Sequence, residues 1–127
     1  MIGLDTNILV RYLVQDHLEQ ARLAGQLIES GDTFFINQIV LCELVWVLVS
    51  CYDLDKQQII AVLEKILVIH QFKIENSDLA RKALEDFKDS KSDFSDCLIG
   101  RANQAYGCKM TASFDKNLKK LDSFTVL

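Results

Sequence analysis

Short strand-like runs alternate with longer helix-like segments along the chain, and this alternation restricts the possible folds more than any other feature of the sequence. β-Branched and aromatic residues form a strand-length run at 33–37, and further short strand-like runs stand at 1–5, 72–75, 109–113 and 124–127. Apolar residues recur between these runs with the period of an α-helix. Strands joined through helices need crossover connections, which favour parallel pairing. We therefore expect an α/β fold with a mostly parallel sheet of about five short strands, flanked by helices on both faces.

Polar residues and glycines indicate where the helices begin and end. Asp16 can cap a second helix that Gly31 stops, and Asp53 or Asp55 can begin the helix that follows the long apolar segment. The polar segment 89–93 is the clearest loop of the chain. The sequence shows no repeat, no low-complexity tract and no second domain.

The net charge of the chain argues against a protein that binds nucleic acid over its whole surface. The net charge is −4 and the sequence pI is about 5.1. Proteins that bind nucleic acid over their whole surface usually carry a basic excess. Any contact with nucleic acid should therefore be confined to a local site.

The cysteines and the apolar segments indicate the compartment. The chain has no CxxC pairing, and we expect reduced core thiols at Cys42, Cys51, Cys97 and Cys108. The start of the sequence does not resemble a signal peptide, and the apolar run 39–52 is short for a membrane span and contains an acid. We expect a cytoplasmic protein without a membrane segment.

Acidic residues follow two of the predicted strands. Asp5 ends the first apolar run, and Asp115 comes two residues after the run 109–113. Ligands of open α/β sheets bind beyond the carboxyl ends of the strands, so acids there are candidates for a site. Each acid also precedes a helix-like segment and could serve only as its N-cap.

Glu43 interrupts the longest apolar segment of the chain, residues 39–52. The length of this segment favours a helix that is buried nearly all round. A carboxylate in such a helix needs a partner, because burying an unpaired charge is costly. The partner could be a metal ion, a hydrogen-bond network, or an arginine such as Arg11 or Arg101.

Asp93 and Asp96 stand three residues apart at the predicted start of a helix, so their side chains project to nearly the same side. A cap at Asp93 and a favourable interaction with the helix dipole are simpler explanations of the pair. Converging carboxylates repel one another, and hard divalent cations relieve that repulsion. A set of oxygen donors without Cys or His points to Mg²⁺ or Mn²⁺, which can support phosphodiester hydrolysis.

Four segments, in this order along the chain, resemble the PIN-domain ribonucleases, and more closely the toxins of VapBC-type toxin–antitoxin pairs. The segments are LDTNILVRYL at 4–13, LCELVWVL at 41–48, DFSDCLIGRANQAYGC at 93–108 and TASFDKNLKKL at 111–121. Each motif alone is weak, whereas the ordered set is fairly specific. The resemblance covers nearly the whole sequence and implies a single PIN-like nuclease domain over residues 1–127.

The resemblance also implies a role for each matching residue. Metal-binding catalytic acids are expected at Asp5, Glu43, Asp96 and Asp115, with Asp93 as an additional metal-binding acid. Thr6, Asn7 and Ser113 match polar positions that support these acids. Members of the family hold one or two Mg²⁺ or Mn²⁺ ions and hydrolyse RNA, often tRNA. The toxins are held silent by a cognate antitoxin, and by the same analogy we expect a homodimer.

Basic residues gather near the end of the chain despite its negative net charge. We expect the RNA backbone to be steered by Arg101, Lys116, Lys119 and Lys120, with Lys109 adding to the local excess. Solvated lysines on an ordinary surface are the alternative. An antitoxin helix could contact the apolar residues around Leu9, Leu13, Val45 and Trp46.

Three other classes of protein compete with this interpretation. A haloacid-dehalogenase-like phosphatase would carry a second acid where Asn7 stands, and a receiver domain would carry an acidic pair after its first strand. A catalytically silent PIN-like scaffold that binds only RNA or a protein is the non-enzyme alternative. Such a scaffold would be expected to lose some of the four acids, and metal binding would separate it from an enzyme.

Overall fold

All strand pairs of the structure are parallel, as the alternation of strands and helices predicts. In the computed structural model, which describes residues 1–127, one sheet has the order β1-β2-β3 and a second sheet pairs β4 with β5. The strands are β1 (Ile2–Gly3), β2 (Phe34–Ile36), β3 (Phe72–Ile74), β4 (Thr111–Ser113) and β5 (Phe124–Val126). Six α-helices lie between and around them in the sequence. The predicted α/β class with five short parallel strands is confirmed, but the strands are divided between two sheets and do not form the single sheet that we expected.

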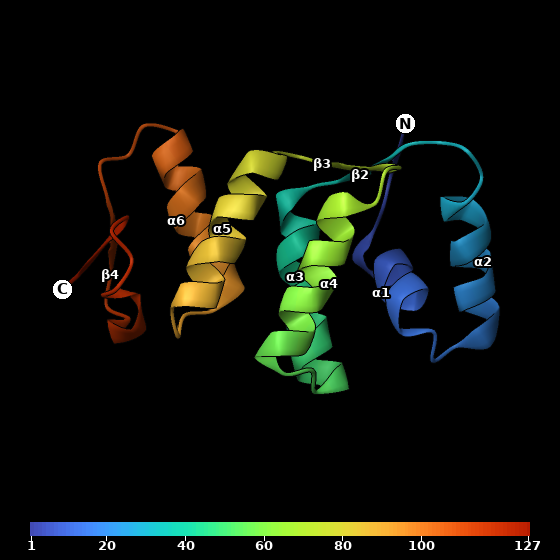
Figure 1. The fold of residues 1–127 in the computed structure, drawn as a ribbon, viewed down its shortest axis with the longest axis horizontal. Helices are drawn as coiled ribbons and strands as arrows, with labels where there is room; N and C mark the ends of the chain where they lie inside the picture. Colours follow the sequence, from blue (N-terminus) through green and yellow to red (C-terminus); the bar gives the residue numbers. More distant parts are fainter. The chain divides into compact units, whose positions relative to one another are not determined.

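The chain divides into two compact units, Met1–Glu75 and Asn76–Leu127. In Figure 1 the first unit runs from blue to yellow-green and the second from yellow to red. The first unit contains β1, β2, β3 and four helices, and the second contains β4, β5, two helices and a short 3-10 turn. Each unit thus has a parallel sheet and helices of its own.

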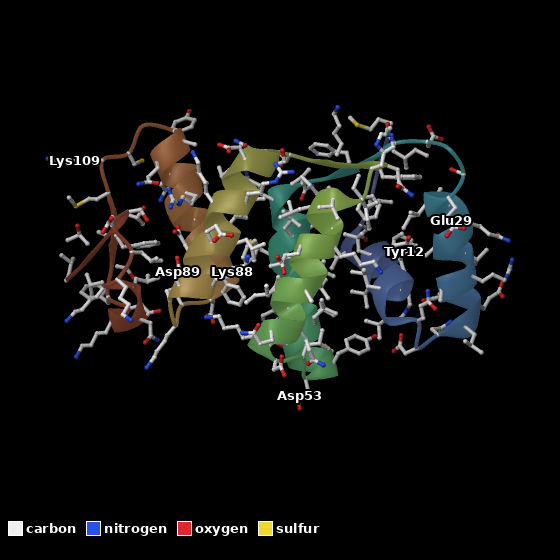
Figure 2. All side chains as sticks on the ribbon, viewed as in Figure 1. Tyr12, Glu29, Asp53, Lys88, Asp89 and Lys109 are labelled. Atoms are coloured by element: carbon white, nitrogen blue, oxygen red, sulfur yellow. The ribbon has the colours of Figure 1, made fainter.

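Polar caps set the bounds of the four helices in the first unit, α1 (Thr6–Val14), α2 (Leu18–Ile28), α3 (Gln38–Tyr52) and α4 (Lys56–Val68). The side chain of Asn37 accepts the N–H of Val40 at 2.8 Å and begins α3. Asp55 and Gln58 form a reciprocal capping box at the start of α4. Asp53 instead ends α3 in the left-handed region, with φ 56°, and lies at the outer end of the α3–α4 hairpin (Figure 2).

The start of α2 differs from the prediction, because His17 and not Asp16 is its N-cap. The Nδ1 atom of His17 accepts the N–H of Gln20 at 3.2 Å. Asp16 accepts from the guanidinium of Arg11 at 3.1 Å and from the hydroxyl of Tyr52 at 2.8 Å. Two donors, one of them charged, compete successfully with a single backbone N–H for this carboxylate.

Helix α3 is not buried nearly all round, which corrects the expectation from its composition. Its side chains Ile39, Trp46 and Val49 are 71%, 66% and 48% exposed. Contacts with α1 and α4 cover only part of its circumference, while its buried side joins the core. That core consists of side chains that are at most 1% exposed, among them Leu9, Ile28, Phe34, Ile36, Leu41, Leu44, Leu48, Ile59 and Ile66. No helix of the structure combines the length and hydropathy needed to cross a membrane.

In the second unit, α5 (Ser77–Asp89) packs against α6 (Phe94–Ala105). The rings of Phe87 and Phe94 meet edge to face, with centroids 6.0 Å apart. Gly100 allows α6 and β5 to approach closely, because a Cβ at this position would lie 2.5 Å from the ring of Phe124. The 3-10 turn η1 (Lys116–Leu118) stands between the two strands of the sheet.

The loop expected at residues 89–93 is shorter than predicted, and its serines are more buried than their polarity suggests. Helix α5 continues through Asp89, and Ser90 and Ser92 are only 5% and 4% exposed. The hydroxyl of Ser90 donates to the backbone carbonyl of Asp86 at 2.7 Å and lies 2.5 Å from the hydroxyl of Ser92. Because the two hydroxyls have partners, their burial carries little penalty.

The cysteines are all free thiols, but they are not all core residues. Cys97 is buried and Cys42 is half-buried, whereas Cys51 and Cys108 are exposed. The expectation of core thiols is therefore wrong for the last two. Cys51 lies in the last turn of the partly exposed helix α3, and Cys108 follows the end of α6.

Candidate active site

Thr6 connects two of the predicted acids within the first unit. Its backbone N–H donates to Oδ1 of Asp5 at 2.8 Å, and its hydroxyl donates to Oε1 of Glu43 at 3.0 Å. Thr6 itself is only 8% exposed, so its two donors are held by the core of this unit. A single buried residue therefore orients the carboxylates at the end of β1 and on α3.

Helix capping explains the contact of only one oxygen of the Asp5 carboxylate. Asp5 is the N-cap of α1, but its carboxylate accepts only the N–H of the next residue, Thr6. Asn37 and Asn76, at the starts of α3 and α5, each reach the N–H three residues further on. The side chain of Asp5 is thus exposed, with its second oxygen free of the cap.

Glu43 has a partner, but it is neither buried nor paired with an arginine. It lies on the exposed part of α3, which corrects the expectation of a buried carboxylate. The guanidinium of Arg11 binds Asp16, and that of Arg101 binds Asp86. The hydroxyl of Thr6 remains as the contact of Glu43. The hydrogen-bond alternative therefore holds, and the ion-pair alternative does not.

Three predicted acids influence one another in the second unit. Burial raises the pKa of Asp96 above its ordinary value, and the charges of Asp93 and Asp115 raise it further. Asp93 is the N-cap of α6 by position, yet its side chain makes no capping hydrogen bond. The capping explanation thus fails for the side chain of Asp93, and Asp96 lies in a field of like charges.

The turn after β4 fixes Asp115. The hydroxyl of Ser113 accepts the N–H of Asp115 at 3.0 Å, and Oδ1 of Asp115 accepts the N–H of Asn117 at 2.9 Å. Asp115 is therefore a true N-cap of η1, as the simpler explanation predicts. Ser113 thus contacts the backbone of Asp115, and its supporting role for the carboxylate stays a prediction.

The acids of each unit offer donor atoms that suit a hard divalent cation. The structure brings Asp5 and Glu43 together in one unit and couples Asp93, Asp96 and Asp115 in the other. All of their donor atoms are carboxylate oxygens, the ligands that Mg²⁺ and Mn²⁺ prefer. No group of three or more His, Cys, Asp or Glu side chains in the structure stands ready to hold a metal ion. The combination of the five acids into one centre therefore stays a prediction.

The predicted RNA-steering residues differ in how much charge they offer. Arg101 is engaged by Asp86 through Nε–Oδ2 at 2.7 Å and Nη2–Oδ1 at 2.9 Å. The exposed residues Lys116, Lys119 and Lys120 form no ion pair. The basic excess of the C-terminal segment thus resides in its lysines. Lys109 lies on the connection between α6 and β4 (Figure 2).

Two features near the acids were not foreseen from the sequence. Asn7, predicted to support the acids, is exposed and helps line a hollow of about 500 Å³ between α1 and α2. Phe114 stands between Ser113 and Asp115 and is 80% exposed. Phe114 directly follows β4, and continued strand alternation would point its side chain away from that of Ser113.

Comparison with known proteins supports the relation inferred from the motifs. The family model of the PIN domain matches residues 2–123, a range that contains all five acids. A VapC ribonuclease of Aquifex aeolicus (strain VF5) is 30% identical over 127 residues, covering 97% of this chain and 93% of the relative. The match therefore extends through both units. The chain belongs to the PIN-domain family.

Proposed function

We propose that the chain is a metal-dependent endoribonuclease and the toxin of a VapC-type toxin–antitoxin pair. The observation that carries this proposal is the double contact of Thr6 with Asp5 and Glu43, because it orients two acids that are far apart in the sequence. The relation to a VapC ribonuclease over nearly the whole chain supports the reaction. Hydrolysis of RNA phosphodiester bonds is the reaction class that both features favour.

The acids of both units contribute to the proposed reaction. Asp5, Glu43, Asp96 and Asp115 would hold Mg²⁺ or Mn²⁺, with Asp93 as an additional ligand. The chemistry supplied by the ion, when bound, is activation of water and stabilisation of negative charge on the phosphate. The chain itself supplies carboxylates in fixed positions, and none of its side chains needs to act as a covalent nucleophile.

Polar neighbours hold these carboxylates in place. Thr6 orients Asp5 and Glu43, and Ser113 orients the backbone at Asp115. Asn7 lies next to Thr6 in the first turn of α1, where its exposed amide can contact substrate. Such supporting partners commonly change metal affinity or activity by about 10- to 100-fold when removed.

The proposed substrate is RNA, with tRNA among the structured RNAs that the family resemblance suggests. The three exposed lysines Lys116, Lys119 and Lys120 provide the positive charge that attracts a phosphate backbone. Arg101 contributes less to this attraction, because Asp86 already neutralises it. The contact with RNA is thus local, in agreement with the net charge of −4.

An antitoxin is the proposed protein partner, and the exposed face of α3 is its proposed contact. Leu9 is fully buried and belongs to the core, so it cannot contact a partner as the sequence suggested. Trp46 remains available, together with Ile39 and Val49 on the same helix. We also propose a homodimer, which sedimentation of the purified chain would test.

A catalytically silent PIN-like scaffold is the alternative function. A silent scaffold would not gain stability from Mn²⁺, whereas a metal site gains it by mass action. The discriminating measurement is the midpoint of thermal unfolding with and without Mn²⁺, compared with the Asp96→Asn variant. A shift in the unchanged chain that Asp96→Asn removes supports the enzyme.

The decisive experiment is a cleavage assay on total RNA with Mg²⁺ or Mn²⁺, followed by sequencing of the new RNA ends. The unchanged chain should generate defined ends, and Asp96→Asn should generate none while keeping its fold. Growth arrest by the unchanged chain, but not by Asp96→Asn, should accompany expression in cells. Equal cleavage by the two proteins would reject the assignment of the acids.

A further inference from the structure

Three aromatic side chains of the chain are exposed, and one of them adjoins a candidate acid directly. Trp46, Tyr106 and Phe114 are 66%, 93% and 80% exposed. Phe114 precedes Asp115, whereas Tyr106 lies at the opposite end of α6 from Asp96. An exposed aromatic residue is not unusual by itself, so its surroundings must decide whether it has a role.

The backbone on both sides of Phe114 is held firmly. The hydrogen bond from Asp115 N–H to Ser113 closes a turn that contains Phe114, and the hydrogen bond from Asn117 N–H to Asp115 closes the next turn. Leu118, which is 1% exposed, anchors the 3-10 turn that follows. The exposed ring of Phe114 thus projects from a hydrogen-bonded turn directly before Asp115.

Positive charge follows the ring along the chain. The exposed residues Lys116, Lys119 and Lys120 come within six positions of Phe114, and none of them is engaged in an ion pair. Proteins that bind single-stranded nucleic acid combine such cations for the backbone with aromatic rings on which unpaired bases stack. An apolar protein partner would not need the lysines, so this combination favours RNA.

We propose that Phe114 binds an unpaired base of the RNA substrate by stacking, and so places the adjoining phosphate beside Asp115. This inference rests on the proposed ribonuclease function and deepens it, because it selects single-stranded segments of RNA over duplex. Every base has a face on which a ring can stack, so the contact selects unpaired RNA without reading its sequence.

The test measures the binding of a short fluorescent single-stranded RNA by anisotropy, with the same RNA annealed to its complement as a second probe. All proteins carry Asp96→Asn, so that the probes stay uncleaved. Phe114→Ala should weaken binding of the single strand about 5- to 150-fold, the range expected for the loss of one stacked base. Binding of the duplex should change less than twofold, about the level of experimental error.

Matched variants separate stacking from other effects. Tyr106→Ala removes an exposed ring that is remote from the acids and should leave both affinities unchanged. Phe114→Tyr keeps a planar ring and should bind the single strand as well as the parent. Phe114→Leu keeps apolar bulk without the ring and should bind nearly as weakly as Phe114→Ala. Thermal unfolding of each variant identifies any loss of binding that comes from loss of fold.

The possible results are distinct. If Phe114→Ala or Phe114→Leu binds the single strand like the parent while the unchanged chain cleaves RNA with Mg²⁺, the stacking role is wrong and the proposed function stands. If the unchanged chain neither binds nor cleaves RNA, both are wrong. If Phe114→Ala loses affinity for the single strand but not for the duplex, and Phe114→Tyr binds the single strand like the parent, the proposal is supported. This conclusion holds even if the ring also contacts a protein.

Discussion

The hydroxyl of Thr6 lies 3.0 Å from Oε1 of Glu43, a residue 37 positions further along the chain. The backbone N–H of the same threonine donates to Asp5. The geometry of both carboxylates therefore depends on a side chain that is not itself an acid. Changes at this position can test the arrangement of the site while leaving every proposed metal ligand in place.

We predict that Thr6→Val lowers the rate of RNA cleavage by about 10- to 100-fold, the usual effect of removing a partner that orients a ligand. Valine keeps the shape and the backbone N–H of threonine but cannot donate to Glu43. Thr6→Ser keeps the hydroxyl and should retain most of the activity. Initial cleavage rates at saturating Mg²⁺ measure both variants, and a fully active Thr6→Val protein would contradict the role of this contact.

Asp5 allows stability to be separated from activity. Asparagine caps a helix about as well as aspartate, so Asp5→Asn should keep the free energy of unfolding within a few tenths of a kcal/mol. Asp5→Ala should lower it by about 0.5 to 1 kcal/mol, near the small end of the range for caps, because the cap reaches only Thr6. Both variants should lose cleavage. Urea unfolding and the RNA assay test the pair, and normal cleavage by Asp5→Asn would contradict the proposed role of Asp5 as a metal ligand.

The raised pKa of Asp96 predicts a pH-dependent effect on stability. In the folded chain this carboxyl holds its proton more tightly than in the unfolded chain, so its ionisation lowers the free energy of unfolding as the pH rises through the two pKa values. Asp96→Asn cannot ionise. In metal-free solution the variant should therefore unfold at a higher temperature than the parent at neutral pH.

The same comparison has a built-in control. Below the ordinary value of 3.8 both side chains are neutral, and the difference in unfolding temperature should shrink toward zero. A stability difference that is constant with pH would point to packing at position 96 and not to charge. Scanning calorimetry in a chelating buffer, from below that pH to neutrality, makes the distinction.

The lysines of the C-terminal segment should control the salt dependence of RNA binding. We predict that the double variant Lys119→Glu and Lys120→Glu weakens binding and flattens the slope of affinity against salt, because fewer counterions are released from the RNA. The control protein carries Lys65→Glu and Lys73→Glu, at two exposed lysines of the first unit. Its net charge changes by the same amount as that of the first double variant. Fluorescence anisotropy over a salt series measures both proteins. Equal slopes for the two would show that only net charge matters.

The order of strands and helices was predictable because each element carries its own local signal. The runs at 33–37 and 72–75 became β2 and β3, and Asp55, one of the two acids expected to begin the helix after the apolar segment, is the N-cap of α4. Competition between partners was not predictable. Asp16 could have capped α2, but Arg11 and Tyr52, which approach it only in the folded chain, bind it more strongly.

The assignment of the candidate acids to a site stays a prediction, and their surroundings differ from what the sequence suggested. Composition suggested a buried Glu43, yet a helix is covered only where other elements meet it, and α3 keeps Glu43 and Trp46 exposed. The contact between Thr6 and Glu43 depends on the packing of α1 against α3, which no spacing in the sequence reveals. The pairing of Arg101 with Asp86 across α5 and α6 is hidden for the same reason.

If Asp93, Asp96 and Asp115 hold a divalent cation as proposed, the stability of the chain would depend on the supply of that cation. Without a cation, burial and the charges of Asp93 and Asp115 disfavour the ionised form of Asp96, whereas a bound cation would favour that form and stabilise the folded chain. A cell that is short of metal would therefore hold a chain that opens more often and is degraded sooner. The acids proposed to cleave RNA would therefore also speed the degradation of the chain when no metal is bound and it cannot cleave.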